Sequence, residues 1–153
     1  MARLICALVV LTAPLSLTAA DDDVRKELAA LKGTWKTVAA EAAGTPFPKD
    51  AIPPFTWIIA ADGKSTARLP QGDFPVTITV DPTKNPKCLV NLHQSGNDKG
   101  KRQYGVYKLE GDRLTICLTP PGADEDARPK DFATKGTPNV LLVLERLKED
   151  QKP

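Results

Sequence analysis

The sequence predicts an all-β protein, an eight-stranded antiparallel up-and-down barrel with one short N-terminal helix. Many short segments alternate apolar and polar residues, as half-buried antiparallel strands do. Tight turns such as Asp62-Gly63 and Gly111-Asp112 join neighbouring segments into hairpins. Only one substantial segment shows helical spacing. Because closure removes exposed strand edges, these patterns favour a barrel over the alternative, a sandwich of two sheets.

The first twenty residues have the pattern of a secretory signal peptide. A short basic start, Met1 to Arg3, precedes an apolar run from Leu4 to Leu11, and the small residues Thr18 to Ala20 form a cleavage site. The apolar run is shorter than the roughly 20 residues that a transmembrane helix needs. We therefore expect a signal peptide at 1–20 cleaved after Ala20, a single domain at 21–153, no transmembrane segment, and a secreted or periplasmic location.

The expected helix runs from Val24 to Lys32, directly after three aspartates. Val24, Leu28 and Leu31 lie at helical spacing, and Gly33 ends the helix. The aspartates suit the positive end of the helix dipole, or simply form a solvated N-terminus after cleavage.

The strands follow as short segments bounded by Gly, Pro, Asn and Asp. Two long proline-rich connections, Gly44–Pro54 and Pro120–Pro138, flank the first and last strands. A polar second face, such as Thr77 and Thr79, marks half-buried strands. The eight expected strands are Thr34–Ala42, Phe55–Ala61, Lys64–Leu69, Phe74–Val80, Lys87–Leu92, Gln103–Leu109, Arg113–Thr119 and Asn139–Leu147.

Three residues predict how the barrel is closed at one end. Gly33 and Trp35 open the first strand in a Gly-x-Trp pattern, and Arg146 lies in the last strand. This combination is typical of lipocalin-like barrels, in which the indole plugs one end and the guanidinium packs over its face. Such a cation–π contact contributes about 0.5–2 kcal/mol. Trp35 and Arg146 are therefore expected to stack.

Residues spread from Leu31 to Arg146 match the pattern of a known family. They are Leu31–Lys36, Glu41, Gly44, Pro46, Pro48, Asp81–Lys84, Gly105–Cys117, Pro120–Gly122, Arg128–Pro129, Phe132 and Val140–Arg146. With these residues the chain resembles a family of exported planctomycete proteins with a lipocalin-type (calycin) barrel. That family has no established activity, so the resemblance implies the barrel and assigns no catalytic residue. Lipocalins carry a second motif, Thr-Asp-Tyr, where this chain has Glu110-Gly111-Asp112.

Charge and cysteine content exclude some functions. The net charge is +2, and bases and acids are interleaved, whereas a nucleic-acid-binding protein needs a concentrated basic face. Cys88 and Cys117 fall on the fifth and seventh expected strands. Two strand spacings are roughly 9–10 Å, beyond the distance of about 7 Å that a disulfide allows. Free thiols are therefore favoured, with a disulfide as the alternative.

No group of residues predicts catalysis, a cofactor or a metal site. His93 and Ser95 are too close in sequence for a nucleophile and its base, and His93 is expected to be a solvated loop residue. Cys117 lies between apolar residues in mid-strand, where a thiol is inert. Asp124 to Asp126 lacks the ligand order of a calcium loop. The protein is therefore not expected to be an enzyme.

The remaining candidate is a binding cavity inside the barrel for a small apolar or amphipathic ligand. Thr37, Ala39 and Glu41 share a face with Trp35, and Glu41 is expected either inside the barrel or at its rim, paired with a lysine. Aromatic side chains would form the walls, or would simply fill the core. They are Phe55, Trp57, Tyr104 and Tyr107. The alternative function is a protein-interaction or inhibitor module in the cell envelope that acts through its rim loops.

Overall fold

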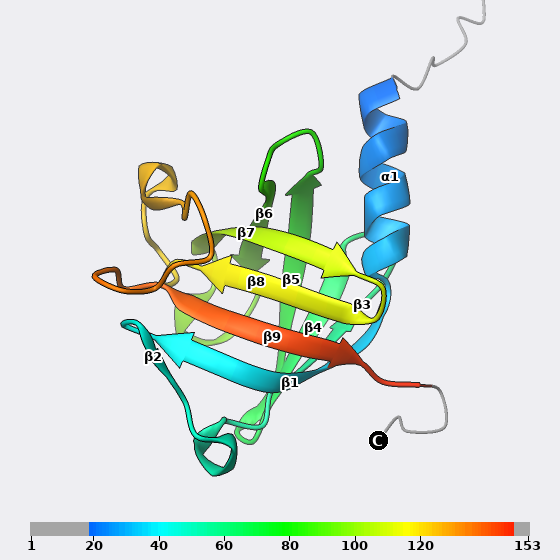
Figure 1. Ribbon diagram of the computed structural model, residues 1–153. Helices are drawn as coiled ribbons and strands as arrows, with labels where there is room; N and C mark the ends of the chain where they lie inside the picture. Colours follow the sequence, from blue (N-terminus) through cyan, green and yellow to red (C-terminus); the bar gives the residue numbers. More distant parts are fainter. Residues whose placement is uncertain (1–18, 149–153) are drawn as a thin grey trace, which may run out of the picture.

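The computed structural model describes residues 19–148 (Figure 1). Residues 1–18 of the predicted signal peptide lie outside the described residues, so its cleavage stays a prediction. Helix α1 spans Ala19–Leu31 and begins earlier than the expected Val24. No helix among residues 19–148 is long and apolar enough to cross a membrane.

The strands form one antiparallel sheet that closes on itself, because β1 pairs with both β3 and β9. The predicted barrel is therefore confirmed and the sandwich is excluded. All eight expected strands are present, and a two-residue strand, β2, adds a hairpin to β1. The strands are β1 Gly33–Ala42, β2 Thr45–Pro46, β3 Thr56–Ile59, β4 Lys64–Leu69, β5 Gly72–Asp81, β6 Lys87–His93, β7 Arg102–Glu110, β8 Arg113–Leu118 and β9 Val140–Arg146.

Strand β1 contains a β-bulge that changes which residues face the barrel interior. Its pairing with β9 shifts register between Thr37 and Ala39. An extra residue in a strand of period two reverses the faces beyond it. Ala40, which is 5% exposed, therefore faces inward in place of Ala39, and Glu41 points away from the interior.

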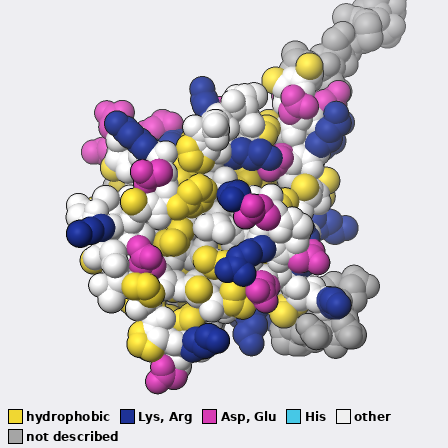
Figure 2. Space-filling model, viewed as in Figure 1, with side chains coloured by type: hydrophobic (Ala, Val, Ile, Leu, Met, Phe, Trp, Pro, Cys, Tyr) yellow, Lys and Arg dark blue, Asp and Glu magenta, His cyan; other side chains and the backbone are white. Residues whose placement is uncertain are grey.

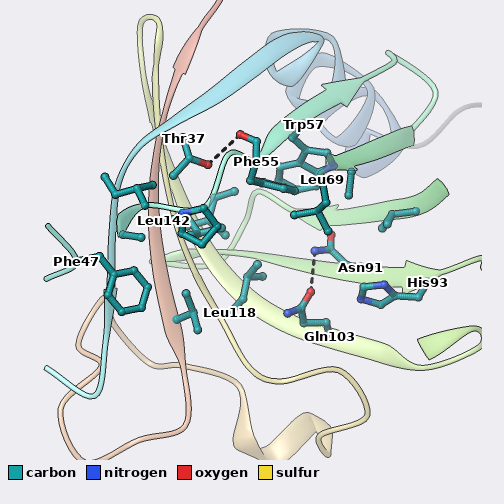
Figure 3. A pocket seen from close by; sticks show the side chains of 17 residues that line it. Thr37, Phe47, Phe55, Trp57, Leu69, Asn91, His93, Gln103, Leu118 and Leu142 are labelled. Atoms are coloured by element: carbon teal, nitrogen blue, oxygen red, sulfur yellow. Dashed lines mark hydrogen bonds between the residues drawn. The ribbon is translucent and has the colours of Figure 1, made fainter. Parts of the chain in front are cut away.

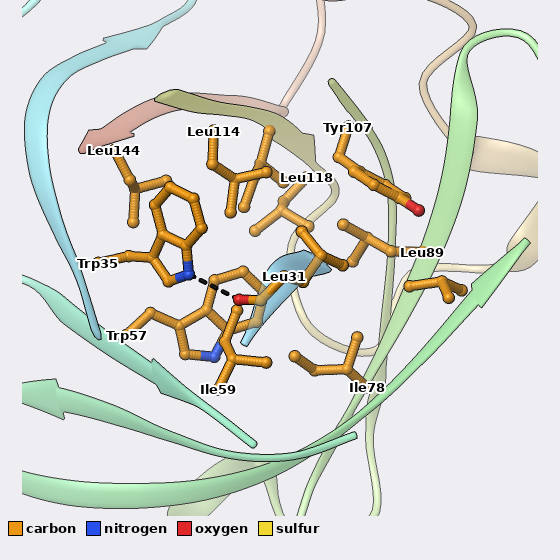
Figure 4. Close-up of a cluster of buried hydrophobic side chains, with 12 residues drawn as sticks. Leu31, Trp35, Trp57, Ile59, Ile78, Leu89, Tyr107, Leu114, Leu118 and Leu144 are labelled. Atoms are coloured by element: carbon orange, nitrogen blue, oxygen red, sulfur yellow. Dashed lines mark hydrogen bonds between the residues drawn. The ribbon is translucent and has the colours of Figure 1, made fainter. Parts of the chain in front are cut away.

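The half of the barrel next to α1 is filled with apolar side chains (Figure 4). Leu31 reaches this core from the end of α1, and Val24 and Leu28 pack against its edge. The core contains Leu31, Trp35, Trp57, Ile59, Ile78, Val80, Leu89, Tyr107, Leu114, Ile116, Leu118 and Leu144.

Trp35 and Arg146 join the end of α1 to the barrel. The Arg146 guanidinium lies 4.2 Å from the centre of the fully buried Trp35 ring, so the expected stacking is present. Trp35 Nε1 donates to the Leu31 carbonyl at 2.8 Å. Arg146 donates to the carbonyls of Ala30, at 2.8 Å, and Lys32. Because the last carbonyls of a helix lack partners within it, these bonds satisfy the end of α1.

A polar cluster attaches the middle of α1 to the barrel rim. The Lys87 ammonium donates to both carboxylate oxygens of Glu27 at 2.8 Å, and the Tyr107 hydroxyl donates to the same carboxylate at 3.1 Å. Burial, reinforced by the Glu27 charge, raises the pKa of the Tyr107 phenol well above its ordinary value. Tyr107 therefore stays a neutral donor and anchors the helix.

The connection between β8 and β9 packs against the outer wall of the barrel. Arg128 lies 5.0 Å from the centre of the Tyr104 ring and donates to the carbonyls of Leu89 and Gly105 at 2.9 and 3.2 Å. Thr134 is fully buried. Tyr104 is thus buried on the outer face of the wall, covered by this connection.

Cys88 and Cys117 lie on β6 and β8, with β7 between them, and both are free. Cys117 is fully buried, and burial raises the pKa of its thiol to about 11, whereas Cys88 is partly exposed. Because the thiolate is the reactive form, we expect iodoacetamide to label Cys88 in the folded protein and Cys117 only after unfolding. Peptide mass spectrometry with and without denaturant measures this. Equal labelling of both thiols in the folded protein would contradict the burial of Cys117.

Candidate functional site

The half of the barrel away from α1 contains a cavity of about 300 Å³ (Figure 3). Its walls are mostly apolar and come from nearly every strand of the barrel. The lining residues are Thr37, Ala40, Phe47, Ile52, Pro53, Phe55, Trp57, Ala67, Leu69, Val76, Asn91, His93, Gln103, Ile116, Leu118, Val140 and Leu142. The barrel interior is therefore part core and part pocket.

The segment between β2 and β3 contributes four of the lining residues. Phe47 is 38% exposed and is the most exposed large hydrophobic side chain among residues 19–148. The segment is held to β1, because the Phe55 carbonyl accepts from both the N–H and the hydroxyl of Thr37, at 3.1 and 3.2 Å. The exposed ring of Phe47 therefore lies on a segment that hydrogen bonds hold in place, and it forms an apolar mouth for the cavity.

The floor of the cavity is shared with the core and consists of Trp57, Ile116 and Leu118. Trp57 Nε1 donates to Ser65 Oγ at 3.0 Å, and the Ser65 hydroxyl donates to the Val76 carbonyl at 2.9 Å. The polar atoms of Trp57 and Ser65 therefore already have hydrogen-bond partners within the protein. The indole can therefore offer its apolar face to a ligand.

One side of the cavity is polar and comes from β6 and β7. Gln103 Nε2 donates to the Thr119 carbonyl at 2.8 Å, and Asn91 Nδ2 donates to Gln103 Oε1 at 3.3 Å (Figure 3). Asn91 is 5% exposed, yet its Oδ1 atom has no hydrogen-bond partner, and neither has the buried Nε2 atom of His93. A buried polar atom without a partner costs about 1–3 kcal/mol. This pair is therefore available for a ligand or water.

Of the residues expected to line the cavity, Thr37, Phe55 and Trp57 do so. The expectation is wrong for Ala39 and Glu41, because the bulge in β1 reverses the faces of the strand beyond Thr37. The Glu41 carboxylate instead accepts from the Thr134 hydroxyl outside the barrel, and no lysine among residues 19–148 forms an ion pair with it.

The two tyrosines also lie elsewhere. Tyr104 points to the outer wall under Arg128, and Tyr107 belongs to the core beside α1. They are three positions apart on one strand, so they face opposite sides of it. An aromatic side chain in a barrel strand indicates burial but does not distinguish the cavity, the core and a covered outer wall.

The expectation that His93 is a solvated loop residue is wrong. It is the last residue of β6, lines the cavity, and is half-buried. Period-two alternation places it on the same face as Leu89 and Asn91. Its place in the cavity could have been predicted by extending the alternation of the expected strand by one residue.

The site offers little to a catalytic mechanism or a metal. His93 is the one titratable residue among those lining the cavity. Within residues 19–148, no cluster of three or more His, Cys, Asp or Glu side chains is arranged to hold a metal ion. What the geometry provides is an apolar volume with a small polar patch.

Charged side chains are spread over the molecular surface without a dominant sign. Figure 2 shows basic and acidic side chains interspersed over the visible face. Several form exposed ion pairs, such as Arg68 with Asp73 at 2.9 Å and Lys108 with Glu110 at 2.8 Å. No charged ligand is therefore favoured by the visible surface, which leaves the cavity as the candidate site.

Comparisons of the chain with protein-family models, with curated proteins and with solved structures found no match.

Proposed function

We propose that the protein is a non-catalytic binder of a small apolar or amphipathic molecule, held in the barrel. The observation that carries this proposal is the cavity of about 300 Å³, which has apolar walls and lies at the end of the barrel away from α1. Ligand sites are typically concave, mostly apolar and roughly 300–1,000 Å³ in volume, with a few polar groups. The cavity has these properties at the small end of the range.

The division of the interior supports a role in binding. The core beside α1 already provides the buried cluster that stabilises the barrel, with Trp35, Ile116 and Leu144 fully buried. Removing apolar surface from water is favourable by about 25 cal/mol per Å², and the walls of an empty cavity do not gain this free energy. A ligand that covers these walls recovers that free energy on binding. If the predicted signal peptide is used, the binding takes place outside the cytoplasm.

A side chain that fills the cavity tests the proposal. Ala67 lines the cavity from β4, whereas Thr66 faces the other side of the same strand. We expect A67F to weaken the binding of a neutral naphthylamine dye about tenfold or more, the effect of losing roughly 1.4 kcal/mol of apolar burial. T66F is the matched control and should bind like the unmodified protein, with thermal unfolding used to confirm that both variants are folded.

Dye binding that is equally strong in A67F, T66F and the unmodified protein would overturn the proposal, because the dye would then bind outside the cavity. Native mass spectrometry of protein from its own host adds a second readout, in which a co-purified small molecule is expected. The alternative, a protein-interaction or inhibitor module, stays a prediction. A stoichiometric protein partner together with an empty cavity would favour it.

A further inference from the structure

We infer that the cavity selects a neutral apolar alcohol, whose hydroxyl group donates to Asn91 beside His93. This inference rests on the proposed function and specifies the chemistry of its ligand. It starts from two buried atoms without partners, Asn91 Oδ1 and His93 Nε2, which belong to residues lining the same cavity. The two residues are two positions apart on β6, so their side chains project from the same face about 6–7 Å apart along the strand.

The orientation of the Asn91 amide follows from a chain of hydrogen bonds that begins at the backbone. The Thr119 carbonyl can only accept, so Gln103 must turn its NH₂ group towards it, at 2.8 Å. The Gln103 oxygen then faces Asn91 and accepts from the Asn91 NH₂ group at 3.3 Å. Asn91 is left with its oxygen free. Reversing either amide would oppose two acceptors or two donors. The unsatisfied atom of Asn91, buried in the cavity wall, is therefore an acceptor, and a ligand group that satisfies it must supply a donor.

The lining of the cavity favours a ligand whose hydrogen-bond donor is a neutral group. A carboxylate head has no proton to donate to Asn91 Oδ1, and two facing oxygens repel each other. An ammonium head could donate, but the lining contains no Asp or Glu to balance its charge. Burying an unpaired ion costs several kcal/mol. A hydroxyl group meets neither difficulty.

A hydroxyl group also suits His93. It donates one hydrogen bond and accepts others, so a hydroxyl group that donates to Asn91 Oδ1 keeps lone pairs that can accept from an N–H group nearby. A hydroxyl group therefore satisfies the acceptor of Asn91 and is compatible with the ring of His93 beside it. The rest of the ligand extends over the apolar floor formed by Trp57, Ile116 and Leu118. The ligand class is thus a compact apolar body with one hydroxyl group.

Three ligands with similar chains and different heads test this inference: n-octanol, octanoate and methyl octyl ether, each used to displace the naphthylamine dye from the full domain. We expect the alcohol to bind about fivefold to tenfold more tightly than the ether, which cannot donate to Asn91, and octanoate to bind most weakly. In N91L the advantage of the alcohol over the ether should disappear. I116V changes the floor without touching the polar patch, so it should weaken all ligands alike and keep their order.

The outcomes separate the two proposals. If all three ligands displace the dye equally, the cavity binds apolar chains but ignores the head, so the inference is wrong and the proposed function stands. Octanoate binding more tightly than octanol would also overturn the inference. If no ligand displaces the dye and A67F does not affect the dye, the proposed function itself is wrong. The comparison of heads uses the unmodified protein, so it is decisive even if N91L fails to fold.

Discussion

Replacing Trp35 by alanine is expected to lower the free energy of unfolding by about 3–5 kcal/mol, the cost of truncating a fully buried large aromatic side chain. Trp35 is 0% exposed and lies in the core between the barrel and α1 (Figure 4). The substitution also removes the donor to the Leu31 carbonyl and the surface on which Arg146 packs. Loss of the plug therefore loosens the helix as well as the barrel.

Urea unfolding followed by circular dichroism measures this loss. R146M is the companion variant and should cost less, about 1–3 kcal/mol, because the methionine keeps part of the apolar stem. The carbonyls of Ala30 and Lys32 that it releases lie next to a side chain 26% exposed, so water can reach them. A loss below about 1 kcal/mol in W35A would refute the role of the indole as the plug.

Gly33→Ala is expected to cost about 2–4 kcal/mol, from two separate causes. Gly33 has φ +143, a conformation that residues with a Cβ rarely adopt. A Cβ atom there would also lie 2.7 Å from Nη1 of Arg146. The glycine therefore makes both the turn from α1 into β1 and the close approach of the guanidinium possible.

Gly72 is a matched control for this prediction. Its φ is +142, but a Cβ atom there meets nothing within 4 Å. G72A therefore measures the backbone strain alone, about 1–3 kcal/mol, and the excess cost of G33A measures the conflict with Arg146. In an R146M background this excess should shrink, as a double-mutant cycle can show. Equal losses in G33A and G72A would mean that the guanidinium moves aside at little cost.

Local sequence patterns predicted most of the barrel. Alternation of apolar and polar residues located all eight expected strands, and Asp62-Gly63 and Gly111-Asp112 join neighbouring strands as tight turns. The stacking of Arg146 on Trp35 could also be predicted, because it depends on residue types at the two ends of the chain of strands. The strands and turns depend on residues close together in sequence. The stacking repeats a combination of residue types that is known from other barrels.

The cavity could be predicted only in part. A single bulge after Thr37 reversed the expected faces of Ala39 and Glu41, and a bulge depends on how β1 pairs with β9, which is distant in sequence. The mouth of the cavity comes from an irregular connection whose path periodicity does not describe. The polar patch of Asn91 and His93 was missed because polar residues in half-buried strands usually face solvent.

Strand order, hairpin turns and the end plug are encoded by short-range alternation and by a few residues with special chemistry, so they can be recognised in the one-dimensional chain. Which part of the interior is filled and which part is open depends instead on the packing of side chains from strands distant in sequence. Trp57, for example, lies at the boundary between core and cavity because of what β1, β4 and β8 place around it. Packed volume is a collective property of many side chains, and only the folded barrel establishes it.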